Sequence, residues 1–345
     1  MSLPIVGALA ACGGRRTAPR PASIDVQASE GAFSDYFVLR DSIVLEQTRD
    51  LPIVRVSGID VDAGGRILLG DVSEGNVKLF DAHGKLLGIM GRKGAGPGEF
   101  NQPRFPRFGP DGRIYVADGQ MGRLSIFSDG LELLRTIQFN IFPLGGFEIL
   151  PGDRFLISQD PGEPREGVLA ALDTAGDVVG RMAPKERFLP ATEPTSPLWR
   201  MVSQYWVALD GDTAYVAGTL ADTVWKVSLQ DSSMTGVHLT IPEYKAPTLP
   251  ETSLKEGGLA ALTAWQKSFH IAATIGASRG WIAIPYVQGV LNYGDPMILV
   301  VRTPEGRWLA LTGAKPVIKV VNGELIALEH PDDPEHVVLG VYRPR

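Results

Sequence analysis

The chain has 345 residues, of which 44% are hydrophobic, enough to build one large domain or two smaller ones. Its formal net charge of −6 lacks the basic footprint that binds nucleic-acid phosphates, so no nucleic-acid partner is expected. The single cysteine, Cys12, excludes an internal disulfide and any metal site built from several cysteines. Forty Gly and 26 Pro are spread between short apolar runs, which is typical of many strands joined by turns.

The first twelve residues are apolar and end in Leu9-Ala-Ala-Cys12. This run is too short to span a bilayer but suits the hydrophobic part of a secretory signal. Its last four residues resemble the lipobox of bacterial lipoproteins, in which lipid is attached to the cysteine. The resemblance implies that Cys12 is the lipid attachment site and residues 1–12 a signal segment. The alternative is an ordinary N-terminal thiol. Residues 13–34 show no periodicity, which predicts a flexible tether.

A repeat begins after Tyr36–Gln47, a segment whose alternating pattern predicts a half-buried strand. Two units, which start at Gly58 and Phe108, align without a gap. Each unit contains four short runs separated by turns, and four antiparallel strands in about forty residues are typical of a β-propeller blade. The alignment superposes Gly65 on Gly112, Asp71 on Asp118, Asn76 on Arg123 and Phe80 on Phe127.

The later units are more degenerate, and the last, residues 317–343, holds only three strands. The strand at 36–47 would supply its fourth and close the ring, which predicts a six-bladed, all-β propeller over residues 35–345. Two insertions, 183–202 and 242–270, interrupt the pattern. In the second, Leu262, Trp265 and Phe269 have helical spacing, which predicts a short helix on one propeller face. Long loops on one face are where such scaffolds usually bind.

Residues 91–128 resemble an NHL-type repeat: G-x-x-G-x-G-P-G-E-F-x-x-P precedes D-G-x-I-Y-V-A-D and R-L-x-I-F. With the lipobox, the segment A-D-T-V-W-K-V at 221–227 and the helical insertion, the chain resembles the bacterial six-bladed β-propeller lipoproteins. That resemblance implies a protein anchored in the bacterial envelope. Because Gly13, not Asp, follows the cysteine, it also implies an outer-membrane lipoprotein that faces the periplasm or the cell surface.

Candidate metal ligands are few. The five histidines stand alone, without H-x-H or H-E-x-x-H spacing, so no zinc site is predicted. Asp60 and Asp62 could reach the channel and bind Ca²⁺ with Asp332 and Asp333, but a solvated strand face and a polar loop explain them as well. We therefore expect no cofactor. No serine lies in a G-x-S-x-G elbow, which leaves a Ser-His-Asp hydrolase without support.

Basic residues concentrate around the best-defined repeat of this acidic protein. They are either a solvated rim or a positive patch for an anionic ligand or acidic partner. The glycine-rich run at 91–98 lacks the order of a phosphate-binding loop and is better explained as a blade crossing. Asp71 and Asp118 are expected to order their hairpins through a pair with the residue at 76 or 123. The candidate binding rim comprises Arg92, Lys93, Arg104, Arg107 and Arg123.

These features favour a monomeric binding or scaffold module that takes a protein or small ligand on one propeller face, with the membrane as a second partner through the lipid. One alternative is a metal-dependent propeller hydrolase or lyase, of the gluconolactonase or peptidyl-lyase type, with a site at the channel mouth. Another is a carbohydrate binder, which would need exposed tryptophan faces among Trp199, Trp206, Trp225, Trp265, Trp281 and Trp308.

Overall fold

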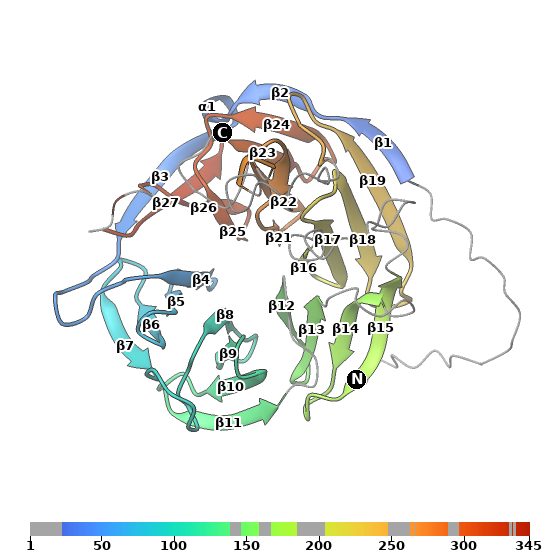
Figure 1. Cartoon of the computed structure of the whole chain (residues 1–345). Coiled ribbons are helices and arrows are strands. Elements are labelled where there is room, and N and C mark those ends of the chain that lie inside the picture. Colours follow the sequence, from blue (N-terminus) through green and yellow to red (C-terminus); the bar gives the residue numbers. More distant parts are fainter. Residues whose placement is uncertain are drawn as a thin grey trace, which may run out of the picture.

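The structure, a computed structural model, describes residues 23–138, 146–158, 167–184, 204–247, 263–265, 267–288, 297–330, 333 and 336–345. In it, six antiparallel sheets surround a common axis (Figure 1). Each blade has four strands from the inside outward, as the repeat predicted. The six-bladed β-propeller is therefore confirmed. No described helix is long and apolar enough to cross a membrane.

The first three blades follow the chain in order. Blade 1 consists of β4 (Val56–Val61), β5 (Ile67–Asp71), β6 (Asn76–Phe80) and β7 (Leu86–Met90). Blade 2 consists of β8 (Pro103–Phe108), β9 (Ile114–Asp118), β10 (Arg123–Phe127) and β11 (Leu133–Gln138). Blade 3 consists of β12 (Phe147–Leu150), β13 (Arg154–Ser158), β14 (Gly167–Leu172) and β15 (Val178–Pro184).

Blades 4 to 6 include two variations: β20 and β21 both pair with β22 as an interrupted inner strand, and blade 6 takes its outer strand from the N-terminal part of the chain. Blade 4 consists of β16 (Tyr205–Asp210), β17 (Thr213–Gly218), β18 (Thr223–Ser228) and β19 (Met234–Thr240). Blade 5 consists of β20 (His270–Ala272), β21 (Gly276–Ser278), β22 (Trp281–Gln288), β23 (Met297–Arg302) and β24 (Trp308–Thr312). Blade 6 consists of β25 (Val317–Val321), β26 (Glu324–Leu328), β27 (Val338–Pro344) and β3 (Phe37–Val44).

Ring closure occurs as expected. Strand β3 pairs antiparallel with β27, from Phe37 opposite Pro344 to Val44 opposite Val338. The backbone N–H of Arg345 also donates to the carbonyl of Tyr36 at 2.9 Å. The segment predicted at 36–47 therefore covers an edge that would otherwise expose unpaired backbone groups.

The segment just before β3 differs from the expectation of a tether over 13–34. Strand β1 (Ser23–Gln27) runs parallel to β19, β2 (Ser29–Ala32) runs parallel to β24, and α1 (Phe33–Tyr36) leads into β3. The reason is that the outer edges of blades 4 and 5 offer free backbone donors and acceptors, which this segment satisfies. Ala28 and Phe33 are buried against these blades. Residues 1–22, with Cys12, lie outside the described residues.

The core lies between adjacent blades because both faces of each inner sheet are covered. All five residues of β5 are buried. Ile67 and Leu69 pack toward blade 6, against residues such as Ile326, whereas Leu68 packs toward blade 2, against Ile114. Alternate side chains of a strand point to opposite faces, so a continuous apolar run fits a sheet buried on both sides.

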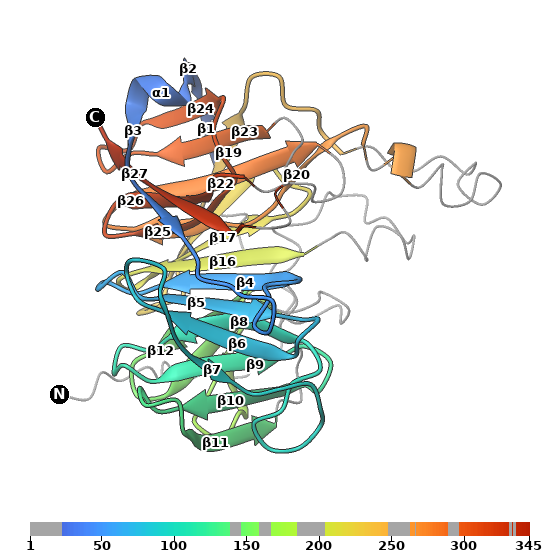
Figure 2. The same ribbon diagram turned by 90° about the vertical axis from the view of Figure 1, so that its left-hand side faces the viewer.

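We call the side of the ring on which the innermost strands begin the loop face. Strand β4 begins next to the end of β5, with Val56 opposite Asp71, and β8 has the same relation to β9. Strand β20 and the helical turn at 263–265 lie at this side, at the right in Figure 2. Of the expected helix, residues 263–265 are helical, whereas Phe269 lies in the turn that follows; its ring centroid is 5.1 Å from that of Trp265. Leu262 and most of both insertions fall outside the described residues.

Candidate functional site

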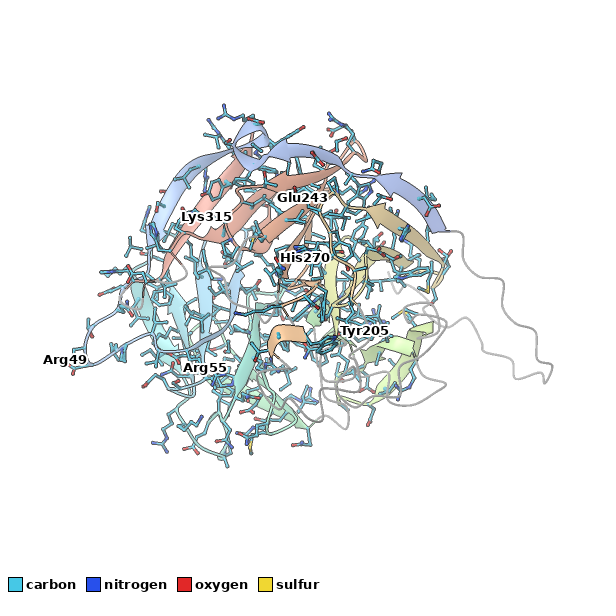
Figure 3. The ribbon with its side chains drawn as sticks, turned by 45° about the horizontal axis from the view of Figure 1, so that its top comes forward. Arg49, Arg55, Tyr205, Glu243, His270 and Lys315 are labelled. Atoms are coloured by element: carbon cyan, nitrogen blue, oxygen red, sulfur yellow. The ribbon has the colours of Figure 1, made fainter. Side chains whose placement is uncertain are left out.

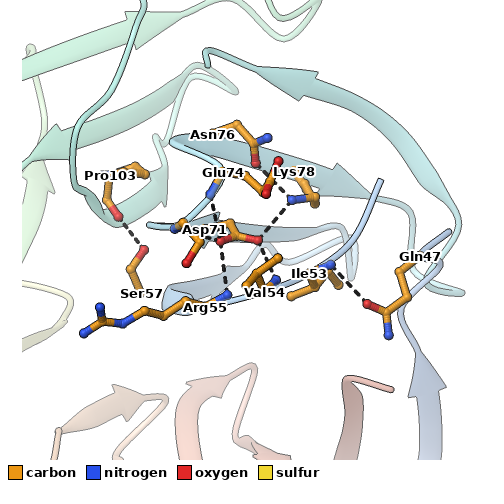
Figure 4. A network of polar contacts seen from close by, with 11 residues as sticks. Gln47, Ile53, Val54, Arg55, Ser57, Asp71, Glu74, Asn76, Lys78 and Pro103 are labelled. Atoms are coloured by element: carbon orange, nitrogen blue, oxygen red, sulfur yellow. Dashed lines mark hydrogen bonds and ion pairs between the residues drawn. The ribbon is translucent and has the colours of Figure 1, made fainter. Parts of the chain in front are cut away.

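The carboxylate of Asp71 organises the loop face of blade 1 (Figure 4). It accepts hydrogen bonds from four backbone N–H groups, those of Val54 at 2.8 Å, Arg55 at 3.1 Å, Ser73 at 3.1 Å and Glu74 at 3.3 Å. The ammonium of Lys78, only 1% exposed, lies 3.3 Å from the same carboxylate. One buried side chain therefore joins the start of β4 to the β5–β6 turn.

Blade 2 repeats this arrangement at the aligned position. Asp118 accepts from the backbone N–H groups of Asn101 at 2.7 Å and Met121 at 3.0 Å, and likewise from residues 102 and 120. Arg123 does not pair with this carboxylate. Its guanidinium donates to the carbonyls of Ala95, Gly96 and Glu99, which holds the blade crossing. The predicted ordering role is present, but the expected Asp–Arg pair is replaced by backbone contacts.

Four of the five residues of the candidate rim are engaged within the fold. Arg92 pairs with Glu99 at 2.7 Å, and Lys93 donates to the carbonyls of residues 72 and 101. Arg107 donates to the carbonyl of Phe147 and lies 3.8 Å from Glu148, while Arg123 is held as described above. The fifth, Arg104, forms no ion pair with a described residue.

Arg104 has a neighbour that sequence reasoning missed. Arg55 precedes β4, and Ser57, two residues later, donates its hydroxyl to the carbonyl of Pro103, the residue before Arg104. This contact brings the backbone segments that carry the two arginines together where the first two inner strands begin. Figure 4 shows the Arg55 side chain extending away from Asp71, whose carboxylate binds only its backbone. No sequence motif identifies Arg55 as a candidate, because its proximity to Arg104 depends on the packing of β8 against β4.

On the innermost strands, charged side chains from four blades compensate one another. Lys319 of β25 lies 2.6 Å from Asp60 of β4, and Arg107 of β8 lies 3.8 Å from Glu148 of β12. Burial raises the pKa of Glu148, although the charges of Lys319 and Arg107 oppose this shift. Each carboxylate has a basic partner, so this cluster does not have the surplus of acidic oxygen ligands that Ca²⁺ requires.

The other acidic candidates are not brought together. Asp62 accepts from the backbone N–H and guanidinium of Arg66, and Asp333 accepts from the backbone N–H of His336. Asp332 lies outside the described residues. Within the part of the chain that the structure describes, no three His, Cys, Asp or Glu residues are placed to hold a metal.

Besides His336, whose Nδ1 lies 3.3 Å from Asp333 Oδ2, two histidines have defined side-chain surroundings. His238 lies between Asp25, at 3.1 Å, and Asp222, at 3.3 Å. His270 is 6% exposed, and its Nδ1 accepts from the backbone N–H of Lys245 at 2.9 Å, so the proton of the neutral ring is on Nε2. Burial, together with the charge of Lys245, lowers the pKa of His270 below its ordinary value. Figure 3 shows His270 near the centre of the ring, Arg55 farther from the centre and Arg49 at the circumference.

The tryptophans do not offer open faces in the described part of the molecule. Trp225, Trp265 and Trp308 are buried. Trp206 is half-buried and donates its indole N–H to the carbonyl of Ala272 at 2.7 Å, and the half-buried Trp281 packs in the core between blades 5 and 6. Trp199 lies outside the described residues. Carbohydrate stacking therefore gains no support from the five described indoles.

Comparisons with known proteins agree with the fold. The model of the DUF5128 family, described as a 6-bladed beta-propeller, matches residues 23–161. Curated proteins give no match. A solved member of the DUF4221 family from Bacteroides vulgatus is 13% identical with a TM-score of 0.68, covering 90% of this chain and 98% of that one. A candidate exported protein from Bacteroides fragilis is 12% identical with a TM-score of 0.66, covering 94% and 100%. The chain is thus similar, in its ring of six blades, to propeller proteins of Bacteroides.

Proposed function

We propose that this protein is an extracytoplasmic binding or scaffold module, tethered to the bacterial envelope by lipid on Cys12 and acting as a monomer through its loop face. The lipobox at 9–12 supports the tether, and the similarity to a candidate exported protein supports the compartment. The NHL-type resemblance of residues 91–128 is part of this proposal and concerns the fold of the blades, not the ligand.

The observation that carries this proposal is the distribution of charge along the channel. Asp60, Lys319, Arg107 and Glu148 neutralise one another in the channel, whereas Arg104 at its mouth has no acidic partner among the described residues. A hydrolase or lyase of the metal-dependent kind needs carboxylates free to hold a cation, and here each is compensated. The Arg104 guanidinium is therefore left available to another molecule on the loop face, which favours binding over the enzymatic alternative.

Anchoring is tested by mass analysis of the full chain extracted from membranes, with C12S as the matched control. We expect a diacylglyceryl mass on the wild type and release of C12S into the soluble fraction. An unmodified wild-type chain in the soluble fraction would refute the lipid tether.

Binding through the loop face is tested by placing a photo-crosslinking residue at exposed Glu74, in the β5–β6 turn, or at exposed Asp129, on the opposite side of the ring. In envelope preparations we expect a discrete adduct from position 74 and none from position 129. Adducts from 129 alone, or from neither position, would contradict the proposal.

A further inference from the structure

We infer that Arg55 and Arg104 form an anion-binding subsite at the channel mouth, which takes a carboxylate or phosphate group of the ligand. This inference rests on the proposed function because it assigns a ligand chemistry to the loop face. Of the five residues of the candidate rim it keeps only Arg104, and it adds Arg55, which was not part of that rim.

The position of the pair is set by contacts between blades 1 and 2. The hydroxyl of Ser57 donates to the carbonyl of Pro103, which fixes the start of β4 against the start of β8. Gly70 permits this approach, since a Cβ there would lie 2.7 Å from the Ser57 hydroxyl oxygen. The carboxylate of Asp71 holds the backbone of Arg55. Both arginine side chains therefore project from backbone that is tied in place, which limits the entropy lost on binding.

The two guanidinium groups lack an acidic partner among the residues that the structure describes. Arg104 is half-buried, with its guanidinium carbon 5.6 Å from the centre of the Phe105 ring. Burial, and to a lesser extent the charge of Arg55, lowers the pKa of Arg104. Two like charges held together, one of them partly desolvated, are unfavourable alone, and an oxyanion would offset both costs.

The surroundings indicate which anions fit. A guanidinium donates two parallel N–H groups, a geometry that matches carboxylate and phosphate oxygens.

The test is calorimetric titration of the full C12S chain with citrate and, separately, with inorganic pyrophosphate, as the carboxylate and phosphate probes. We expect saturable binding of at least one probe, weakened about tenfold or more in R55Q and in R104Q. R104K should bind more weakly than the wild type because a lysine lacks the bidentate geometry. R343Q, which removes an exposed arginine of β27, is the matched control and should bind as the wild type does.

Thermal unfolding of each variant separates loss of binding from loss of folding, and R104K supplies the test if R104Q does not fold. The subsite would be overturned if neither probe bound the wild type. It would also be overturned if a folded R55Q, R104Q or R104K protein bound the probe as tightly as the wild type does. If the subsite is overturned but position 74 still gives a crosslinked adduct, the loop face remains a binding surface. The subsite and the proposed function can therefore be refuted independently.

Discussion

The replacement D71N tests the claim that one carboxylate organises blade 1. Asp71 is fully buried, and its two oxygens accept from four backbone N–H groups and from the ammonium of Lys78. Asparagine keeps the volume but removes the charge and one acceptor oxygen. Lys78, 1% exposed, would then retain only the side-chain oxygen of Asn76, at 3.0 Å, as a described partner. Removing one member of a buried ion pair costs about 3–5 kcal/mol.

The double variant D71N/K78M separates the two parts of this cost. Methionine removes the buried charge with little change of shape, so the ion-pair part of the loss should be recovered. A residual loss of about 1–3 kcal/mol is expected, because backbone donors would still face the amide NH₂ group. Equilibrium urea unfolding followed by circular dichroism measures all three proteins.

The exposed pair of Arg40 and Glu324, 3.4 Å apart, provides the control. The arginine side chain is 50% exposed, so R40Q should change stability by no more than about 1 kcal/mol. A loss below about 1 kcal/mol in D71N, or no recovery when K78M is added, would refute the view that the Asp71–Lys78 pair stabilises blade 1.

Three further predictions follow from the inner strands and from ring closure. G70A should destabilise the protein by about 1–3 kcal/mol in urea unfolding, since the added methyl lies 2.7 Å from the Ser57 hydroxyl oxygen. G180A, in strand β15, is the matched control, because its added methyl would come no closer than 3.9 Å to a neighbouring atom and should change stability little. The pKa of His270 is lowered from its ordinary value of 6.5, so the stability gained from keeping this ring neutral is fully present above pH 6.5 and is lost as the pH falls through the folded-state pKa. Melting temperatures measured from pH 7.5 downward should therefore fall more steeply for the wild type than for H270Q. Parallel curves for the two proteins would contradict this prediction. Deletion of residues 1–44 should expose the edge of β27 and cause aggregation, which size-exclusion chromatography would detect. Deletion of residues 1–32 keeps β3 and should leave a folded ring. Equal behaviour of the two truncated proteins would argue against closure by β3.

The blades could be predicted because their determinants are local. Asp71 and Asp118 recur at the same position, and each binds the backbone of its own turn and of the segment before its blade. The apolar runs between them reflect sheets buried on both faces. In later blades, Ser158 and Thr219 occupy the corresponding strand ends and donate to carbonyls of the preceding segment, so the position persists although the motif does not.

The features that sequence reasoning missed depend on contacts between distant segments. Strands β1 and β2 pair through backbone atoms with strands more than two hundred residues away, and such pairing requires no particular side chains. Lys319 meets Asp60 only because blade 6 neighbours blade 1. Arg55 became a candidate only when β8 was seen to approach β4, whereas composition alone drew attention to Arg92 and Arg123, whose charges are used inside the fold.

The N-terminal segment limits how far the proposed lipid tether could hold the ring from a membrane. Strand β2, α1 and β3 lie at the left in Figure 2, away from β20 and the helical turn. Residues 13–22, even when fully extended, span no more than about 35 Å. If Cys12 carries a lipid, as proposed above, the ring could lie no farther than about that distance from the bilayer, and a ligand of the channel mouth would have to approach it within this layer.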